Sequence, residues 1–366
     1  MPNPNLLSPR RKTRTVHLGS VPIGSEHPVS VQSMTKGETE NVERTLAEIR
    51  ACEEAGVDIM RVAVPYQRAA NALPALLEQV RVPIVADIHF NPKMAFEAMK
   101  HDISSVRINP GNISDREIVT AIVKEAKNKG LHMRIGVNSG SIVPRKGLTV
   151  EEIEADMVDF MVEQALHWVN VVDDLGFHNF TLSIKSSDVN QTIAANRRIA
   201  GMCDVPLHLG VTHAGTPEAA KLKTALAFGT LLAEGIGDTL RVSITGSSEM
   251  EVTFCNDLLA DLGMRERLLE VIACPSCGRA DVDVEEFTLK LEKGLKKLGR
   301  KVRISFLGCA VNGPGEAAEA DFGIVASNRF SMVYKGREMV GKIENDKLVD
   351  EFLELLEREL PQPAPA

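Results

Sequence analysis

Short apolar, β-branched segments alternate with longer amphipathic segments from about residue 28 to residue 264 of the chain. The short segments have the composition of buried strands, and the longer ones repeat apolar positions with the period of a helix. The predicted helices include Val42–Ala55, Gln67–Gln79, Arg116–Lys129, Val150–Leu175, Asp188–Cys203 and Glu218–Glu234. The eight predicted strands are Val29–Met34, Ile59–Val64, Ile84–Phe90, Ser105–Asn109, Met133–Asn138, Phe180–Lys185, Leu207–Thr212 and Thr239–Thr245.

Eight βα units with short connections predict an α/β fold, a closed (β/α)₈ barrel of the TIM type, over residues 15–266. An open doubly wound sheet is the alternative, but no G-x-G-x-x-G motif follows the first strand. After about residue 270 the pattern changes, and a small α+β domain is predicted over residues 267–360. Its predicted elements are helices Val284–Leu298 and Asn345–Glu359, strands Val302–Leu307, Phe322–Ala326 and Ser331–Tyr334, and a glycine-rich loop, Cys309–Glu316.

The chain ends and the composition argue against several classes of partner. Residues 1–14 are polar and basic, and they are predicted as a disordered lead-in, as is the tail, residues 361–366. A formal charge of −8 and only 4% aromatic residues argue against a nucleic-acid partner. No apolar segment is long enough to span a bilayer, so no membrane partner is expected. Six cysteines in 366 residues do not indicate a disulfide scaffold, and a cytoplasmic location is expected.

Basic residues lie at the carboxyl ends of the predicted strands, where barrels of this type carry their functional groups. If they face the interior they need an anion, because burying an unpaired charge is costly. The forked guanidinium suits phosphate oxygens, so a multiply charged ligand is expected. The alternatives are that the arginines point outward to acids on the helices, and that Asp87 and His89 are a pair without chemistry. The residues concerned are Arg61, Asp87, His89, Arg107, Arg134, Asn138, Lys185, Arg241 and Ser243.

Two loops near the C-terminal end place three cysteines and one carboxylate where they could bind a metal. Cys274 and Cys277 form a C-x₂-C pair, Cys309 follows after 31 residues, and Glu316 follows after six more. The C-x₂-C spacing alone serves zinc, iron–sulfur clusters and redox disulfides. A structural zinc site usually has a fourth Cys or His ligand that completes the tetrahedron, but no histidine follows His213. Three thiolates suit three irons of a [4Fe–4S] cluster, and Glu316 would be an exchangeable oxygen ligand for the fourth.

The other three cysteines, Cys52, Cys203 and Cys255, lie in predicted helices and are predicted as packing residues. Two further functions stay open at this point. One is a phosphate-binding barrel with a structural zinc, and the other is a non-catalytic protein that senses a metal or a cluster.

Seven motifs closely resemble those of the 4-hydroxy-3-methylbut-2-enyl diphosphate synthases, iron–sulfur enzymes of the non-mevalonate isoprenoid pathway. The resemblance covers the chain from about Thr15 to Ala326 and corresponds to the shorter bacterial form. It implies an oxidoreductase that opens 2-C-methyl-D-erythritol 2,4-cyclodiphosphate with two electrons from a [4Fe–4S] cluster. It also implies a homodimer and flavodoxin or ferredoxin as electron donor. The motifs are Ala86–Phe90, Arg107–Asn112, Arg134–Asn138, Lys185–Asp188, Gly237–Ser243, Ala273–Cys277 and Gly308–Glu316.

The resemblance implies a role for each candidate residue. Asp87 and His89 become catalytic residues near the hydroxyl end of the substrate, and Glu316 becomes a catalytic ligand of the cluster. The implied substrate contacts are Arg61, Arg107, Arg134, Asn138, Lys185, Arg241, Ser243 and Asn312, and the implied cluster ligands are Cys274, Cys277, Cys309 and Glu316.

One position departs from the family. The family motif after the seventh strand continues from Leu-Gly-Ile/Val-Thr with Glu, whereas this chain has His213. Because histidine can donate a proton near neutral pH, a proton-transfer role could persist there with a different pH profile.

Overall fold

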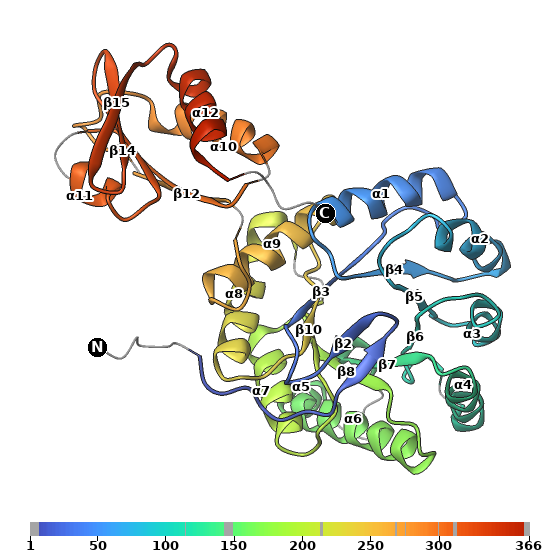
Figure 1. Cartoon of the computed structure of the whole chain (residues 1–366). Helices are drawn as coiled ribbons and strands as arrows, with labels where there is room; N and C mark the ends of the chain where they lie inside the picture. The colour runs from blue at the N-terminus through green and yellow to red at the C-terminus, as the bar shows by residue number, and fades with distance from the viewer. Residues whose placement is uncertain are drawn as a thin grey trace. The chain divides into compact units, whose positions relative to one another are not determined.

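The computed structural model describes residues 7–113, 115–142, 149–212, 215–267, 269–274, 276–298, 300–309 and 313–361. The chain divides into two compact units, Met1–Arg265 and Glu266–Ala366, and each is described by itself (Figure 1). Within the described residues, no helix is both long and apolar enough to cross a membrane.

The first unit contains a parallel sheet of eight strands that curls into a barrel (Figure 1). Its strands pair in the order β8-β7-β6-β5-β4-β3-β10-β9. A parallel bridge between Leu182 and Leu207 joins the two ends of this order, so the sheet closes. The predicted (β/α)₈ barrel is therefore confirmed. The strands are β3 (Ser30–Met34), β4 (Ile59–Ala63), β5 (Ile84–Asp87), β6 (Ser105–Ile108), β7 (His132–Asn138), β8 (Phe180–Lys185), β9 (His208–Leu209) and β10 (Thr239–Leu240).

Helices follow the strands and cover the outside of the barrel (Figure 1). The predicted helix over Val150–Leu175 is wrong in one respect, because the structure breaks it at Asp156 into two helices. Asp156 ends the first helix and its carbonyl accepts the first hydrogen bond of the second. The helices are α1 (Val42–Glu54), α2 (Gln67–Leu77), α3 (Lys93–Ala98), α4 (Arg116–Asn128), α5 (Val150–Ala155), α6 (Met157–Asp174), α7 (Val189–Ala200), α8 (Pro217–Ala233), α9 (Ser248–Asp261) and the 3₁₀ turn η1 (Ser139–Ser141).

A hairpin that the sequence analysis did not predict packs at the amino ends of the barrel strands. In it, β1 (Val16–Leu18) pairs antiparallel with β2 (Val21–Ile23), and Gly19 occupies the turn with a φ of +58°. The buried apolar residues of the hairpin pack on Ile59 of β4 and Val85 of β5. The hairpin therefore covers this end of the barrel with apolar side chains.

Residues 8–14 contact the same unit, so the predicted disorder is wrong for this segment. Arg10 forms a 2.8 Å ion pair with Asp238, which is buried just before β10. The guanidinium of Arg11 donates to three backbone carbonyls at and beyond the C-terminal end of α7. Arg14 forms a 2.8 Å ion pair with Asp173. These arginines satisfy a buried carboxylate and unpaired helix carbonyls, partners that the basic composition of the segment could not reveal.

The second unit is a five-stranded mixed sheet in the order β11-β12-β13-β14-β15. The first three strands are parallel and the last three antiparallel. Two helices pack on one face around Phe306 and Phe352, and a short third helix packs on the other. The elements are β11 (Leu269–Ala273), β12 (Val302–Leu307), β13 (Phe322–Ala326), β14 (Phe330–Lys335), β15 (Glu338–Glu344), α10 (Val284–Leu298), α11 (Gly313–Ala317) and α12 (Leu348–Glu359).

Three parts of this sheet unit differ from the prediction. Strands β11 and β15 were not predicted: no residue of β11 is buried and only Ile343 of β15 is, so neither shows a buried face with period two. The loop predicted over Cys309–Glu316 instead contains the start of α11, so Glu316 lies on a helix. A Cβ atom on Gly323 of β13 would overlap the backbone of Ala317, so this glycine lets α11 pack directly on the sheet.

Replacing Asp238 with Asn should lower the free energy of unfolding of the barrel by about 1–3 kcal/mol, because Arg10 and Arg11 lose their buried counter-charge. Urea unfolding followed by fluorescence measures this effect in the barrel alone, since the single tryptophan, Trp168, lies in α6. The matched control is Glu125→Gln, which removes the charge from an exposed pair with Lys129. This control should change stability by less than about 0.5 kcal/mol. Equal losses in both variants would contradict the role given to the N-terminal arginines.

Candidate active site

Arg134 points into the barrel. From β7, its Nη1 donates to Oε1 of Gln32 on β3 and lies 3.1 Å from Nε2 of His208 on β9. Neither β3 nor β9 is adjacent to β7 in the sheet, so these contacts cross the interior. Burial, together with Arg134 and the other cations, lowers the pKa of His208 well below its ordinary value, so the neutral ring accepts at Nε2. Arg134 is thus held by two uncharged partners, and the sequence analysis had singled out neither of them as a contact.

Asp87 joins three of the predicted residues at the ends of β4, β5 and β6. Its Oδ1 accepts from Nη1 of Arg107 at 3.2 Å, and its Oδ2 lies 3.7 Å from Nε of Arg61 and 3.5 Å from Nε2 of His89. Burial would raise the pKa of Asp87, but Arg61 and Arg107 outweigh this effect and hold the pKa well below its usual range. Burial also lowers the pKa of Arg61 to about 9, so this guanidinium still carries its charge at neutral pH.

Lys185, at the end of β8, is only 9% exposed. No carboxylate of the described residues forms an ion pair with it, and burial followed by the nearby arginines lowers its pKa well below the ordinary value. The same causes lower the pKa of Arg134. Two glycines leave space for the cations: a Cβ on Gly210 would overlap the end of the Lys185 side chain, and one on Gly136 would lie 3.0 Å from Nη2 of Arg107.

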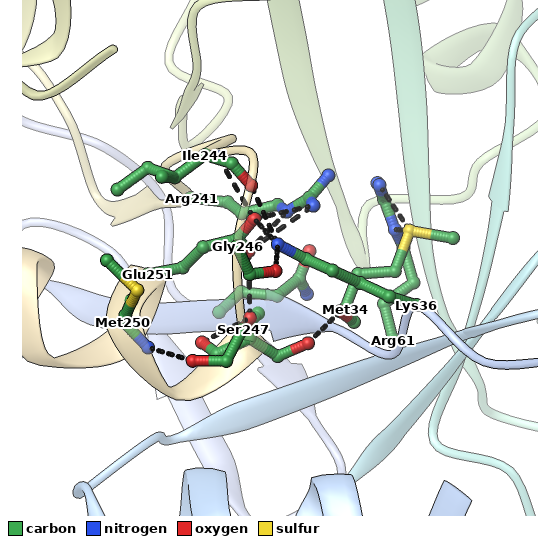
Figure 2. Close-up of polar contacts among 12 residues, drawn as sticks. Met34, Lys36, Arg61, Arg241, Ile244, Gly246, Ser247, Met250 and Glu251 are labelled. Carbon is green, nitrogen blue, oxygen red and sulfur yellow. Dashed lines mark hydrogen bonds and ion pairs between the residues drawn. The ribbon is translucent and has the colours of Figure 1, made fainter. Parts of the chain in front are cut away.

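Arg241, directly after β10, differs from the other cations because it pairs with an acid on a helix. Its Nη2 lies 3.3 Å from Oε2 of Glu251, a buried residue of α9 (Figure 2). Arg241 therefore pairs with a helix acid, as the alternative expects, but it also lies close enough to Arg61, Arg134 and Lys185 to lower the pKa of each. The sequence analysis missed Glu251, although its position among apolar residues in the first turns of the helix after Arg241 was a usable signal.

The remaining predicted substrate contacts are less fully defined. Asn138 lies next to Lys185 in the strand register, and its Oδ1 is buried without a hydrogen-bond partner among the described residues. Ser243 is half-buried two residues after Arg241. Asn312 and the departing position His213 lie outside the described residues.

The barrel interior therefore holds more positive than negative charge in the part that the structure describes. Five predicted cations lie there, while Asp87 and Glu251 are the carboxylates that pair with them. Arg134 and Lys185 have no such partner, and the Nε atoms of Arg107 and Arg134 are buried without an acceptor. Buried charges are stable only when they are paired, so the site is built for an anion with several oxygen acceptors.

The second unit places the three predicted cysteine ligands near one cation. Cys274 follows β11 and Cys309 follows β12, at the same edge of the sheet because the two strands are parallel. Cys277 is exposed, and hydrogen bonds from Arg279 lower its pKa. The hydrogen bond to Cys277, followed by the charges of Cys277, Cys309 and Cys274, raises the pKa of Arg279, so this guanidinium is within electrostatic reach of all three thiols. The sequence analysis missed Arg279.

The donor types fit a thiolate-bound iron site, since the three thiols lie in the segments after β11 and β12 and the carboxylate lies on α11, which follows β12. Within the described residues, however, no three Cys, His, Asp or Glu side chains are already arranged as a metal site. Glu316 is exposed on α11. Pro275 and residues 310–312, which connect these ligands, lie outside the described residues.

The other cysteines do not belong to this group. Cys52 and Cys255 are fully buried in the barrel core, as predicted, and burial raises the pKa of each thiol to about 12. Cys203 is half-buried and packs against the same core. High pKa values keep these thiols protonated and poor as metal ligands.

Comparison with known proteins matches both units to one family. The GcpE TIM-barrel domain matches residues 13–256, and the GcpE protein C-terminal domain matches residues 270–358. A 4-hydroxy-3-methylbut-2-en-1-yl diphosphate synthase (flavodoxin) from Symbiobacterium thermophilum is 43% identical over 95% of this chain and 94% of its own length. Proteins of the same name from Persephonella marina and Halalkalibacterium halodurans are 41% and 42% identical, each over 94% of this chain and over 97% and 93% of their own lengths.

Among solved structures, a dihydropteroate synthase from Xanthomonas albilineans aligns with 69% of this chain and 97% of its own, at 14% identity and a TM-score of 0.49. That likeness is too low to carry an argument. The family models and the near full-length relatives are sufficient: the chain belongs to the family of the 4-hydroxy-3-methylbut-2-en-1-yl diphosphate synthases.

Proposed function

We propose that this chain converts 2-C-methyl-D-erythritol 2,4-cyclodiphosphate to 4-hydroxy-3-methylbut-2-enyl diphosphate, a step of isoprenoid precursor synthesis. The observation that carries the proposal is the excess of buried positive charge at the carboxyl ends of the barrel strands. A cyclic diphosphate brings two linked phosphates with acceptor oxygens on several sides, which suits cations that approach from different strands. The name shared by the relatives supplies the product.

The barrel residues would bind and orient the diphosphate. Arg134 is held by Gln32 and His208, which are uncharged, so its full charge is available to a ligand. Lys185 gains a counter-charge on binding, and the unpaired Nε of Arg107 gains an acceptor. Oxygens held this way are oriented before reaction, and fixed donors stabilise charge that moves onto the diphosphate as the ring opens.

Asp87 and His89 would serve the hydroxyl end of the substrate. The cyclic dianion takes up two electrons and one proton to give the diphosphate trianion and water. His89 is half-exposed, and its Nε2 faces the Asp87 carboxylate at 3.5 Å, so it can hold a proton and pass it to a leaving hydroxyl. Asp87 stays ionised, and its carboxylate faces the His89 ring and can orient it.

Cys274, Cys277, Cys309 and Glu316 would hold a [4Fe–4S] cluster, which when bound supplies the two electrons one at a time. Arg279 hydrogen-bonds Cys277 and favours its thiolate form, which is the form that binds iron. The proposal assigns substrate binding to residues 15–266 and the cluster to residues 267–360. Flavodoxin, which the names of the relatives include, is the proposed donor, with ferredoxin as the alternative. A homodimer and a cytoplasmic location complete the proposal.

Replacing Lys185 with Met should stabilise the ligand-free barrel by about 1–2 kcal/mol while weakening substrate binding at least tenfold. The pKa of Lys185 is lower in the folded state than in the unfolded state, where it is near 10.4. Between these two pKa values the unfolded state binds the proton more tightly, so the free energy of unfolding of the wild-type protein rises with pH. The stability gained by the variant should therefore be largest at low pH and shrink toward pH 10. Urea unfolding across this pH range measures the gain, and calorimetric titration with the cyclic diphosphate measures binding.

The control for that substitution is Lys124→Met, because Lys124 is exposed on α4. It should change neither stability nor affinity. A Lys185→Met protein that is less stable than wild type at every pH, or that binds the cyclic diphosphate as tightly, would contradict the assigned role.

Anaerobically purified protein should contain about four irons and four sulfides per chain and no zinc. With a low-potential reductant it should convert the cyclic diphosphate to the allylic diphosphate.

Glu316→Ala should keep the cluster absorbance but lose at least about tenfold in kcat, whereas Glu319→Ala, which changes an exposed acid near the same helix, should behave as wild type. One zinc without sulfide would contradict the cluster, and an intact cluster without product would contradict the activity. Full turnover by Glu316→Ala would rule out its catalytic role.

A further inference from the structure

Glu251 collects donors from three segments at the mouth of the barrel (Figure 2). The carboxylate is 1% exposed and lies on α9. Its Oε2 accepts from Oγ of Ser33 on β3 at 3.0 Å, and its Oε1 accepts from the backbone N–H of Ile244 at 3.2 Å. The same group pairs with Arg241 and with Lys36, whose Nζ lies 3.1 Å from Oε1. One buried acid therefore ties the end of β3, the segment after β10 and α9 together.

Lys36 directs its ammonium group at Glu251 and at the loop after β10. The group donates to the backbone carbonyls of Ile244, at 2.7 Å, and Gly246, at 2.5 Å, and forms an ion pair with Oε1 of Glu251 (Figure 2). Two of its three N–H bonds therefore go to these carbonyls, and its charge is paired with a carboxylate. Lys36 therefore braces the loop after β3 against the loop after β10, rather than serving as another ligand for an anion.

The contact with Glu251 fixes the direction of the Arg241 guanidinium. Nε and Nη2 of Arg241 lie 3.3–3.4 Å from the two carboxylate oxygens, which leaves the Nη1 edge free of Glu251. Arg241 is close enough to Arg134 and Lys185 to lower the pKa of each. A carboxylate on one edge of a guanidinium neutralises part of this repulsion and sets which edge can meet a phosphate.

We propose that Glu251 is a positioning residue that aims Arg241 at the phosphate groups of the substrate, and that Lys36 holds the loop in which this aim is set. The inference rests on the proposed function, because it concerns the binding of the same diphosphate. Glu251 itself does not contact the substrate. Its effect is transmitted through Arg241, so it should appear in the KM for substrate more than in kcat.

A double-mutant cycle tests the link. In the holoenzyme, Glu251→Gln should raise the KM for the cyclic diphosphate about tenfold and change kcat less than about threefold. Arg241→Met should raise KM by at least as much. In the Arg241→Met background, Glu251→Gln should have no further effect on KM, because there is no longer a guanidinium to aim. Glu251→Asp, which keeps the charge on a shorter side chain, should recover part of the loss.

Lys36→Met should raise KM only about threefold. This variant loses the contacts of Lys36 with the loop after β10 but keeps the ion pair between Glu251 and Arg241. Glu249→Gln, an exposed acid in the same helical turn, is the control and should match wild type. Independent effects of Glu251 and Arg241 on KM, or a loss confined to kcat through a smaller folded fraction, would overturn the positioning role. If the wild-type protein does not bind the cyclic diphosphate at all, the proposed function itself is contradicted. If the wild type binds and turns over this substrate but the Glu251 and Arg241 effects are independent, only the positioning role is contradicted.

Discussion

The structure depends on the burial of positive charge that the protein itself only partly neutralises. Asp87 serves two arginines of neighbouring strands, and Glu251 serves Arg241 from outside the strands. Arg134 and Lys185 have no carboxylate partner among the described residues and lie near other cations, at a cost in stability that a covered, well-packed barrel has to offset. The apolar hairpin at the amino ends and the continuous core between strands and helices supply that packing. A protein keeps such destabilising buried cations where a ligand of opposite charge binds to them and removes the electrostatic penalty.

The two carboxylates divide the site into parts with different tasks. Around Asp87, Arg61 and Arg107 come from the adjacent strands β4 and β6, and His89 follows β5 itself. At Glu251 the contact is between loops, because Lys36 and Arg241 come from segments that follow different strands. The first arrangement suits the fixed placement of charge and a proton. The second suits the alignment of a cation by the loops that surround the mouth.

Much of this arrangement could be predicted from the sequence, and the exceptions have physical reasons. Strand-end residues such as Arg107 and Lys185 follow from alternation along buried strands, because only one face of a barrel strand meets the interior. Glu251 and Arg279 were not predicted as site residues, because they lie outside the strand ends and outside the cysteine motifs. Their importance comes from contacts that form only when the chain folds. The contacts of residues 8–14 escaped for the same reason: composition shows three basic side chains but not the buried Asp238 that holds one of them.

The most direct test is whether the protein takes up a proton when it binds the diphosphate. Calorimetric titration of the cyclic diphosphate between pH 7 and 9, in two buffers with different ionisation enthalpies, gives this number. The depressed pKa of Lys185 should rise when phosphate oxygens place negative charge beside it and the nearby arginines, while the ligand has no group that titrates near this pH. The account predicts net proton uptake on binding, and it predicts that this uptake is lost in Lys185→Met. Tight binding without proton uptake would contradict the claim that an unpaired buried cation is the basis of recognition.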